Sequence, residues 1–165
     1  MNRPNITIHQ NFDDKDIEKL AKCMTSSQSK LDFLNEYNFI GGGFSDYKKI
    51  EEYLTYYKDK VWLIKENDSG LNVGFISFEP AIFNNKEWQL IIYLDKDYKG
   101  KGYAVESIRQ LLIESESIIE KTSSNTIKAN TRNDNKAAQN ALENNGFVLK
   151  NEGALFKEYI YEFKD

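Results

Sequence analysis

Cysteine, histidine and proline are scarce in this sequence. Its 165 residues include one cysteine, Cys23, one histidine, His9, and two prolines. A single cysteine cannot form an internal disulfide, and a lone histidine without cysteine or histidine neighbours at ligand spacing argues against a metal site. We therefore expect a reduced chain that binds no metal.

A membrane span, a secretory signal and an excess of basic residues are missing as well. No stretch reaches the ~18 consecutive apolar residues of a membrane span, and the first residues lack the apolar segment of a signal peptide. Acidic residues outnumber basic ones, 26 to 22, and the resulting net charge of −4 repels a phosphate backbone. We expect a cytoplasmic protein that binds neither nucleic acid nor membrane.

The length and composition indicate one domain over residues 1–165. A chain of this size buries roughly 70% of the surface that its unfolded form exposes, so a hydrophobic core can form without disulfides or metals. No linker or repeat divides the sequence. The chain is therefore treated as one continuous unit.

The hydrophobic pattern of the first half predicts a strand, two helices and a hairpin. The strands are predicted at residues 6–10, 61–65 and 72–78, and the helices at residues 13–24 and 45–57. The aromatic segment Phe33–Phe39 and the run Gly41–Gly43 lie between the helices. Such a long segment with its own aromatic residues is usually functional or partly disordered, and the alternative is that its aromatic side chains pack as core.

The second half begins with Trp88–Leu94, which is nearly all apolar and rich in β-branched and aromatic residues. This composition is typical of a strand that is buried on both faces at the centre of a sheet. The elements predicted after it are a helix from Tyr103 to about Lys121, a strand at residues 126–130, a helix over residues 137–142 that ends at Gly146, and strands at residues 147–150 and 155–163. The fold class is α/β, a mixed central β-sheet with helices on both faces.

A loop rich in glycine and lysine follows the central strand and opens directly into a helix. The first N–H groups of a helix have no partner within it, and the helix dipole adds positive potential there, so the segment Lys99–Ala104 is suited to bind a diphosphate. The alternative is an ordinary turn whose lysines are only solvated. The spacing excludes a P-loop, and Val105 stands where a dinucleotide-binding fingerprint needs a third small residue.

Two motifs carry a resemblance to a known family. Tyr98–Ala104 resembles a pyrophosphate-binding loop, and Asn135–Phe147 is similar to an Asn-x-x-Ser/Ala helix that ends in Glu-x-x-Gly-Phe. Both are features of the GNAT superfamily of acetyl-CoA-dependent N-acetyltransferases, in particular the ribosomal-protein N-terminal acetyltransferase branch. The resemblance implies the GNAT-like acyl-CoA N-acyltransferase fold. It also implies transfer of acetyl from acetyl-CoA to a primary amine of a small molecule or a protein.

The resemblance also implies roles for individual residues. Backbone groups of Tyr93 and Leu94 would pair with the pantetheine arm, and Asn135 would contact the cofactor. The pyrophosphate would be bound by Lys99, Gly100, Lys101, Gly102, Tyr103 and Ala104. An asparagine at the start of a helix is also a favoured N-cap, so capping alone is the alternative for Asn135.

The sequence departs from the family at both usual proton donors. Leu142 and Ala138 stand where relatives carry tyrosine or serine. A thiol with a pKa near 8.5 can leave without an acid, whereas an amine with a pKa near 10.4 must first lose a proton. Glu87 is the candidate base, with Glu79 in reserve, and the alternative for Glu87 is a solvated carboxylate at a strand end.

Two other functions remain open at this stage. Because both usual proton donors are missing, the chain could be a binding module that keeps the fold and the binding of acyl-CoA but has lost turnover. A different nucleotide-binding α/β protein is the third hypothesis, which the spacing disfavours. The net charge favours a cationic acceptor, and the sequence leaves the oligomeric state open, a homodimer included.

Overall fold

The computed structural model describes residues 3–24, 51–52, 55–56, 58–81, 84–119 and 125–163. Its strands are β1 (Ile6–His9), β2 (Val61–Glu66), β3 (Asn72–Ala81), β4 (Asn84–Leu94), β5 (Thr126–Arg132), β6 (Val148–Glu152) and β7 (Phe156–Glu162). Its α-helices are α1 (Asp14–Met24), α4 (Tyr103–Ile119) and α5 (Lys136–Glu143), and short 3-10 helices precede β2 (η2, Lys58–Lys60) and α4 (η3, Lys96–Tyr98). The order of these elements is the one predicted.

Part of the first half lies outside the described residues. This holds for the aromatic segment Phe33–Phe39, for Gly41–Gly43 and for most of the helix predicted at residues 45–57. Residues 51–52 and 55–56, within that predicted range, are helical. Leu20 to Met24, Cys23 among them, are described by their helical backbone only.

The seven strands form one mixed sheet in the order β1-β2-β3-β4-β5-β7-β6. All neighbouring pairs are antiparallel except β4 and β5, which run parallel. β4 is the fourth of seven strands, so the prediction of a central strand is confirmed. The mixed sheet confirms the predicted fold class.

β3 and β4 extend further than the sequence pattern indicates. Strand β3 continues through Pro80 to Ala81, and β4 begins at Asn84 rather than at Trp88. The register shifts between Pro80 and Ala81, which accommodates the missing N–H of the proline. Cross-strand pairing therefore overrides the weak β-propensity of proline and asparagine here.

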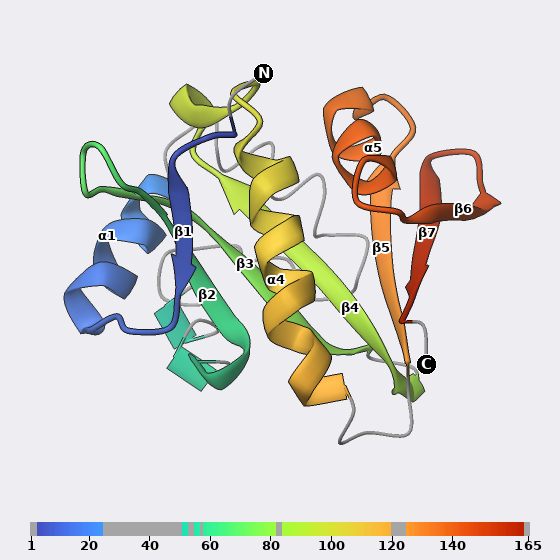
Figure 1. The fold of residues 1–165 in the computed structure, drawn as a ribbon, viewed down its shortest axis with the longest axis horizontal. Coiled ribbons are helices and arrows are strands. Elements are labelled where there is room, and N and C mark those ends of the chain that lie inside the picture. Colours follow the sequence, from blue (N-terminus) through green and yellow to red (C-terminus); the bar gives the residue numbers. More distant parts are fainter. Residues whose placement is uncertain are drawn as a thin grey trace.

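Helices cover both faces of the sheet. Helices α4 and α5 pack on one face over a cluster that includes Ile76, Leu90 and Ile127 from the strands and Leu111 and Leu142 from the helices. Helix α1 contacts β3 on the other side, and its buried Ile17 lies outside that cluster. Figure 1 shows α4 in front of the sheet, crossing β3 and β4. Each fully buried aliphatic side chain contributes about 1.5–3 kcal/mol to this packing.

The parallel pairing between β4 and β5 is short. Only Trp88 with Ile127 and Gln89 with Lys128 are in register, although β4 runs on to Leu94 and β5 to Arg132. Figure 1 shows the two strands meeting at one end and separating toward the ends at which α4 and α5 begin. The sheet is therefore open between its two halves.

Among the helices in the described ranges, none combines the length and the hydropathy needed to cross a bilayer.

Gly74 provides a test of the tight packing between β3 and β4. A Cβ atom at Gly74 would stand 2.1 Å from the carbonyl oxygen of Tyr93, so Gly74→Ala must push the strands apart. We expect a loss of about 3 kcal/mol in the free energy of unfolding, measured with urea. Gly70→Ala is the control. Gly70 has a φ of +70°, but a Cβ atom added there would meet no atom within 4 Å, so the substitution should cost only ~1–2 kcal/mol. Equal losses in the two variants would contradict the steric explanation.

Candidate functional site

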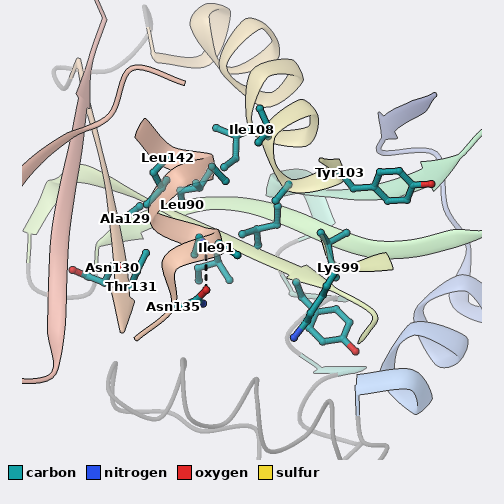
Figure 2. Close-up of a pocket in the computed structure, with 18 of the residues that line it drawn as sticks. Leu90, Ile91, Lys99, Tyr103, Ile108, Ala129, Asn130, Thr131, Asn135 and Leu142 are labelled. Carbon is teal, nitrogen blue, oxygen red and sulfur yellow. Dashed lines mark hydrogen bonds between the residues drawn. The ribbon is translucent and has the colours of Figure 1, made fainter. Parts of the chain in front are cut away.

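A cavity of about 290 Å³ occupies the space where β4 and β5 separate. Helix α4 and helix α5 close it on the face that they share. Figure 2 shows the side chains of these four elements around it. The lining residues are Gln89–Leu94 from β4, Lys99, Gly100 and Gly102 from the loop, Tyr103–Val105 and Ile108 from α4, Ala129–Thr131 from β5, and Asn135, Ala137, Ala138, Ala141 and Leu142 around α5.

One end of the cavity is formed by the loop that opens α4. Gly100 and Gly102 have φ angles of +75° and +79°. These lie in the left-handed region, which is unfavourable for residues that have a Cβ atom. A Cβ atom at Gly102 would also lie 3.2 Å from the ring of Pro4, whereas one at Gly100 would meet no atom within 4 Å. The loop therefore presents open backbone at the N-terminus of a 17-residue helix, which is a favourable place for an anion.

Tyr103, the first residue of α4, fixes this loop to the β2–β3 hairpin. Its hydroxyl donates a hydrogen bond to Glu66 at the end of β2, and its ring stacks on Tyr98 at a centroid distance of 6.0 Å. The ammonium group of Lys101 lies 5.1 Å from the centre of the Tyr98 ring, a cation–π contact. The lysines of the loop thus differ, since Lys99 lines the cavity and Lys101 lies over Tyr98.

The hydrogen bond between Tyr103 and Glu66 anchors the loop, and the hydrogen bonds of Glu66 shift the pKa values of both residues. The bond that Ser69 donates lowers the pKa of Glu66 below its usual 4.5, and the bond from Tyr103 lowers it further. The same contact with Glu66, together with burial, raises the pKa of Tyr103 to about 12. Glu66 is therefore ionised and Tyr103 protonated across the neutral range.

Asn145 fixes the two helices of the cavity relative to each other. Its amide nitrogen donates to the carbonyl oxygen of Val105 in the first turn of α4, at 3.0 Å, and to that of Ala141 in α5, at 2.8 Å. Helix α5 ends at Glu143, and the turn that follows contains Gly146 with a φ of +83°, while the N–H of Phe147 donates to the carbonyl oxygen of Leu142. The predicted helix stop at Gly146 is confirmed.

Asn135 combines an N-cap with a place in the cavity wall. Its side-chain oxygen accepts a hydrogen bond from the N–H of Ala138 at 3.1 Å, as expected of an N-cap. The same residue lines the cavity, and Figure 2 shows it beside Thr131 of β5. Capping is thus part of its role, and a contact with the cofactor remains a prediction.

The wall that α5 contributes is apolar. Leu142 is 3% exposed, and it lines the cavity with Ala138 and Ala141. No side chain of α5 that faces the cavity carries a hydroxyl group. The cavity wall is therefore hydrocarbon at Leu142 and Ala138, the two positions at which a proton donor is expected from the family.

β5 supplies a polar group on the opposite wall. Thr131 is 6% exposed, and its Oγ1 atom has no hydrogen-bond partner within the described part of the chain. Strand alternation places Thr131 with Ala129 on the face covered by α5, and places Asn130 on the other face with Lys128. A buried hydroxyl that has no hydrogen-bond partner among the described residues therefore belongs to the cavity wall.

Glu87 lies near the point at which β4 and β5 separate, outside the cavity wall. Its Oε2 atom is 2.9 Å from the ammonium nitrogen of Lys128, which is also 3.5 Å from Oε2 of Glu158. The hydrogen bond to Glu87 is the main reason why the pKa of Lys128 is raised. Gln89, two residues after Glu87 on the same face, does line the cavity. The side chain of Glu79, in register with Gln89, lies outside the described residues.

The structure brings most of the predicted cofactor residues together. Tyr93, Leu94, Tyr103, Ala104 and Asn135 line the cavity, as do Lys99, Gly100 and Gly102 of the loop. Lys101 and Glu87 do not line it. The cavity wall also includes Gln89, Asn130 and Thr131, which no motif of the sequence marks. Only the register of two parallel strands far apart in the sequence brings them there.

His9 takes part in a local hydrogen-bond network. Its ring nitrogens lie 3.0 Å from the carbonyl oxygen of Asn11 and 3.0 Å from Oδ1 of Asn72, whose amide nitrogen donates to Asp16. Over the described ranges, no three His, Cys, Asp or Glu side chains gather as metal ligands would.

Comparison with known proteins identifies the family. The family model described as an acetyltransferase (GNAT) domain matches residues 10–148, most of the chain and all four elements of the cavity. The chain belongs to the GNAT acetyltransferase family. An uncharacterized N-acetyltransferase of Bacillus subtilis (strain 168), YjdG, is 28% identical over 103 residues, 62% of this chain and 60% of the length of that relative.

Solved structures share the GNAT fold along nearly the whole chain. An acetyltransferase (GNAT family) from Bacillus anthracis superposes with a TM-score of 0.74 and 17% identity, over 98% of this chain and 97% of that one. RimL, a ribosomal alpha-N-protein acetyltransferase in complex with coenzyme A, has a TM-score of 0.71 and 16% identity, over 96% and 94%. A spermidine N-acetyltransferase from Vibrio cholerae has a TM-score of 0.68 and 14% identity, over 96% and 94%.

The anchor between Tyr103 and Glu66 should make stability depend on pH. Because the pKa of Glu66 is lowered in the folded protein, its stabilising contribution is complete above pH 4.5 and is lost as the pH falls through the lowered value. Because the pKa of Tyr103 is raised, its contribution is complete below pH 10 and is lost as the pH rises from 10 to about 12. Tyr103→Phe removes the hydrogen bond and keeps the ring.

We expect the melting temperature of Tyr103→Phe to lie below that of the parent at neutral pH. The difference should shrink in acid and again above pH 10, and melting curves across this range measure it. A difference that is the same at all pH values would show that the hydrogen bond to Glu66 does not cause it.

Proposed function

We propose that this GNAT enzyme transfers the acetyl group of acetyl-CoA directly to a primary amine, with residues 1–165 acting as one N-acetyltransferase domain. The observation that supports this most is the cavity between the separating strands, which ends at the glycine loop and the N-terminus of α4. A long, narrow ligand with a diphosphate at one end matches this combination. Coenzyme A has that shape and charge.

The residues of the cavity fit this ligand. The loop from Lys99 to Ala104 offers backbone N–H groups, two positive-φ glycines and the Lys99 ammonium group for the diphosphate. Tyr93 and Leu94 line the cavity along β4, and their backbone groups would contact the pantetheine arm. Asn135 would contact the arm from the start of α5. When bound, acetyl-CoA supplies the activated acyl group.

Glu87 is the proposed base for the incoming amine. An alkylammonium group with a pKa near 10.4 must lose a proton before it can attack, and a carboxylate can receive it through water. The carboxylate of Glu87 is held by Lys128 close to Gln89, which lines the cavity. The nitrogen then forms a bond to the acyl carbon, and the electron pair of the C–S bond leaves on the sulfur.

Direct attack requires no residue that carries the acyl group. Acetyl-CoA and the amine must then be bound together, so the kinetics should be sequential. Double-reciprocal plots with parallel lines, the pattern of a covalent acyl-enzyme, would contradict the proposal.

The acceptor is proposed to be cationic. The net charge of −4 attracts polyamines and other amines before their deprotonation. Within the family we place the chain near the ribosomal-protein N-terminal acetyltransferases, on the motifs at Tyr98–Ala104 and Asn135–Phe147. A panel of polyamines, aminoglycosides and peptides with free N-termini distinguishes a small-molecule from a protein acceptor.

Binding of acetyl-CoA is the first test. At 100 times its dissociation constant, the ligand should stabilise the folded state by about 2.7 kcal/mol, seen as a rise in melting temperature. Gly100→Val should abolish most of this rise, because a side chain there projects into open space in front of the loop and the backbone conformation is strained. No rise in the parent would overturn the proposed function.

Asn135→Ser separates capping from ligand contact in the same experiment. A serine oxygen also caps a helix, so the unliganded variant should melt close to the parent. A smaller ligand-induced rise would then assign Asn135 to the cofactor, and an equal rise would leave it a cap only.

Glu87→Gln tests the proposed base. We expect kcat/KM for the amine to fall by about 10²- to 10⁴-fold with little change in acetyl-CoA binding, measured by thiol release. Glu158→Gln is the matched control, because it removes the other carboxylate near Lys128 and should leave the rate close to that of the parent. Equal rates in the parent and Glu87→Gln would contradict the assignment.

A second function is favoured by one observation, the hydrocarbon surface that Leu142 and Ala138 present to the cavity. This surface would suit a module that binds acyl-CoA without turnover. Tight binding of acetyl-CoA together with no thiol release on the whole amine panel would establish the module and exclude the transferase.

A further inference from the structure

The Thr131 hydroxyl is a buried polar group in the wall of the cavity. Thr131 is 94% buried, since its exposed fraction is 6%, and its Oγ1 atom has no hydrogen-bond partner within the described ranges. Its backbone is part of the ladder to β7, in register with Lys157, so the strand fixes where the side chain points. A buried hydroxyl without a partner costs free energy. A ligand that enters the cavity would satisfy it.

Other polar side chains of the cavity either form hydrogen bonds within the protein or lie on the other face of the sheet. The Tyr103 hydroxyl donates to Glu66, and the Asn135 oxygen accepts from the N–H of Ala138. Gln89 and Asn130 alternate onto the opposite face of the sheet from Thr131. Thr131 is thus a hydroxyl on the side of the cavity that α5 closes.

The wall that α5 forms, which faces Thr131, carries no side-chain proton donor. Leu142 and Ala138 of α5 line the cavity and carry no polar side-chain atom. A thiolate that forms in this space would be surrounded by hydrocarbon on that side, which disfavours the charged form. One hydrogen-bond donor on the facing strand would offset this, and β5 provides it.

We propose that the hydroxyl of Thr131 donates a hydrogen bond to the sulfur of coenzyme A as the C–S bond breaks. The amine, which has already given one proton to the base, bonds through its nitrogen to the acyl carbon, and the electron pair of the C–S bond stays on the sulfur. The second proton of the nitrogen passes to solvent as the amide forms. Thr131 keeps its own proton throughout, and solvent protonates the thiolate after release. This assignment rests on the proposed function, because it requires coenzyme A in the cavity. Figure 2 shows Thr131 on β5 next to the start of α5.

The test compares coenzyme A with desulfo-coenzyme A, which carries hydrogen in place of the thiol. Isothermal titration gives both dissociation constants for the parent, Thr131→Val, Thr131→Ser and Ser107→Ala. The parent should bind coenzyme A more tightly than desulfo-coenzyme A, and Thr131→Val should reduce that ratio by about 2- to 10-fold, the range of one hydrogen bond. Thr131→Ser, which keeps the hydroxyl, should restore it.

Ser107→Ala is the matched control. Ser107 in α4 is fully buried, and its Oγ atom also has no partner in the described part of the chain, but it does not line the cavity. Loss of this hydroxyl should leave the ratio unchanged. Turnover should follow the same order, with kcat about 10- to 100-fold lower in Thr131→Val, because a hydrogen bond to a charged group is stronger.

The outcomes separate the two proposals. If the parent does not bind coenzyme A, the proposed function fails and this assignment fails with it. If the parent binds coenzyme A, and Thr131→Val has the same ratio of the two dissociation constants as the parent, the proposed function stands. Only the assignment of Thr131 to the sulfur is then overturned. Equal weakening of both ligands would show that Thr131 contacts the arm elsewhere, which also overturns it.

Discussion

The end of the hydrogen-bonded ladder between β4 and β5 is the constraint on which the rest of this structure depends. Parallel strands that stayed paired would form a closed sheet with no room between them. Here the register stops at Gln89 and Lys128, while β4 continues for five residues and β5 for four. The opening places an edge of each strand, and the first turns of two helices, around one cavity.

Several side chains hold the opening in place. Lys128 is the last residue of β5 that pairs with β4. Its ammonium group contacts Glu87 on β4 and Glu158 on β7, so it connects three strands at the point of separation. Asn145 connects the first turn of α4 to α5, and the side chain of Gln110 bonds the backbone of β1 at Ile6 and Ile8. With the contact between Tyr103 and Glu66, these bonds fix α4 against both halves of the sheet. The N-terminal end of α4 is therefore held in place.

The chemistry of the cavity is divided between its walls. The loop and the helix N-terminus provide positive potential at one end, and α5 provides a hydrocarbon surface along the side. Ionisable groups near the reacting end lie on the opposite face of the sheet, where Lys128 holds Glu87. Such a division suits an acyl transfer in which an anion is bound at one end and a proton is removed at the other. The Thr131 hydroxyl is an exception to the apolar side.

The sequence by itself determined the elements, their order and the loop at which an anion would bind. These properties are local, since hydrophobic periodicity, the glycines at 100 and 102 and the stop at Gly146 act within a few residues of the chain. Only the tertiary structure decided that Gln89 and Thr131 share one cavity and that Glu87 is held by Lys128. The physical reason is that strand register and side-chain pairing join residues about 40 positions apart, and no local pattern in the sequence records where a parallel ladder ends.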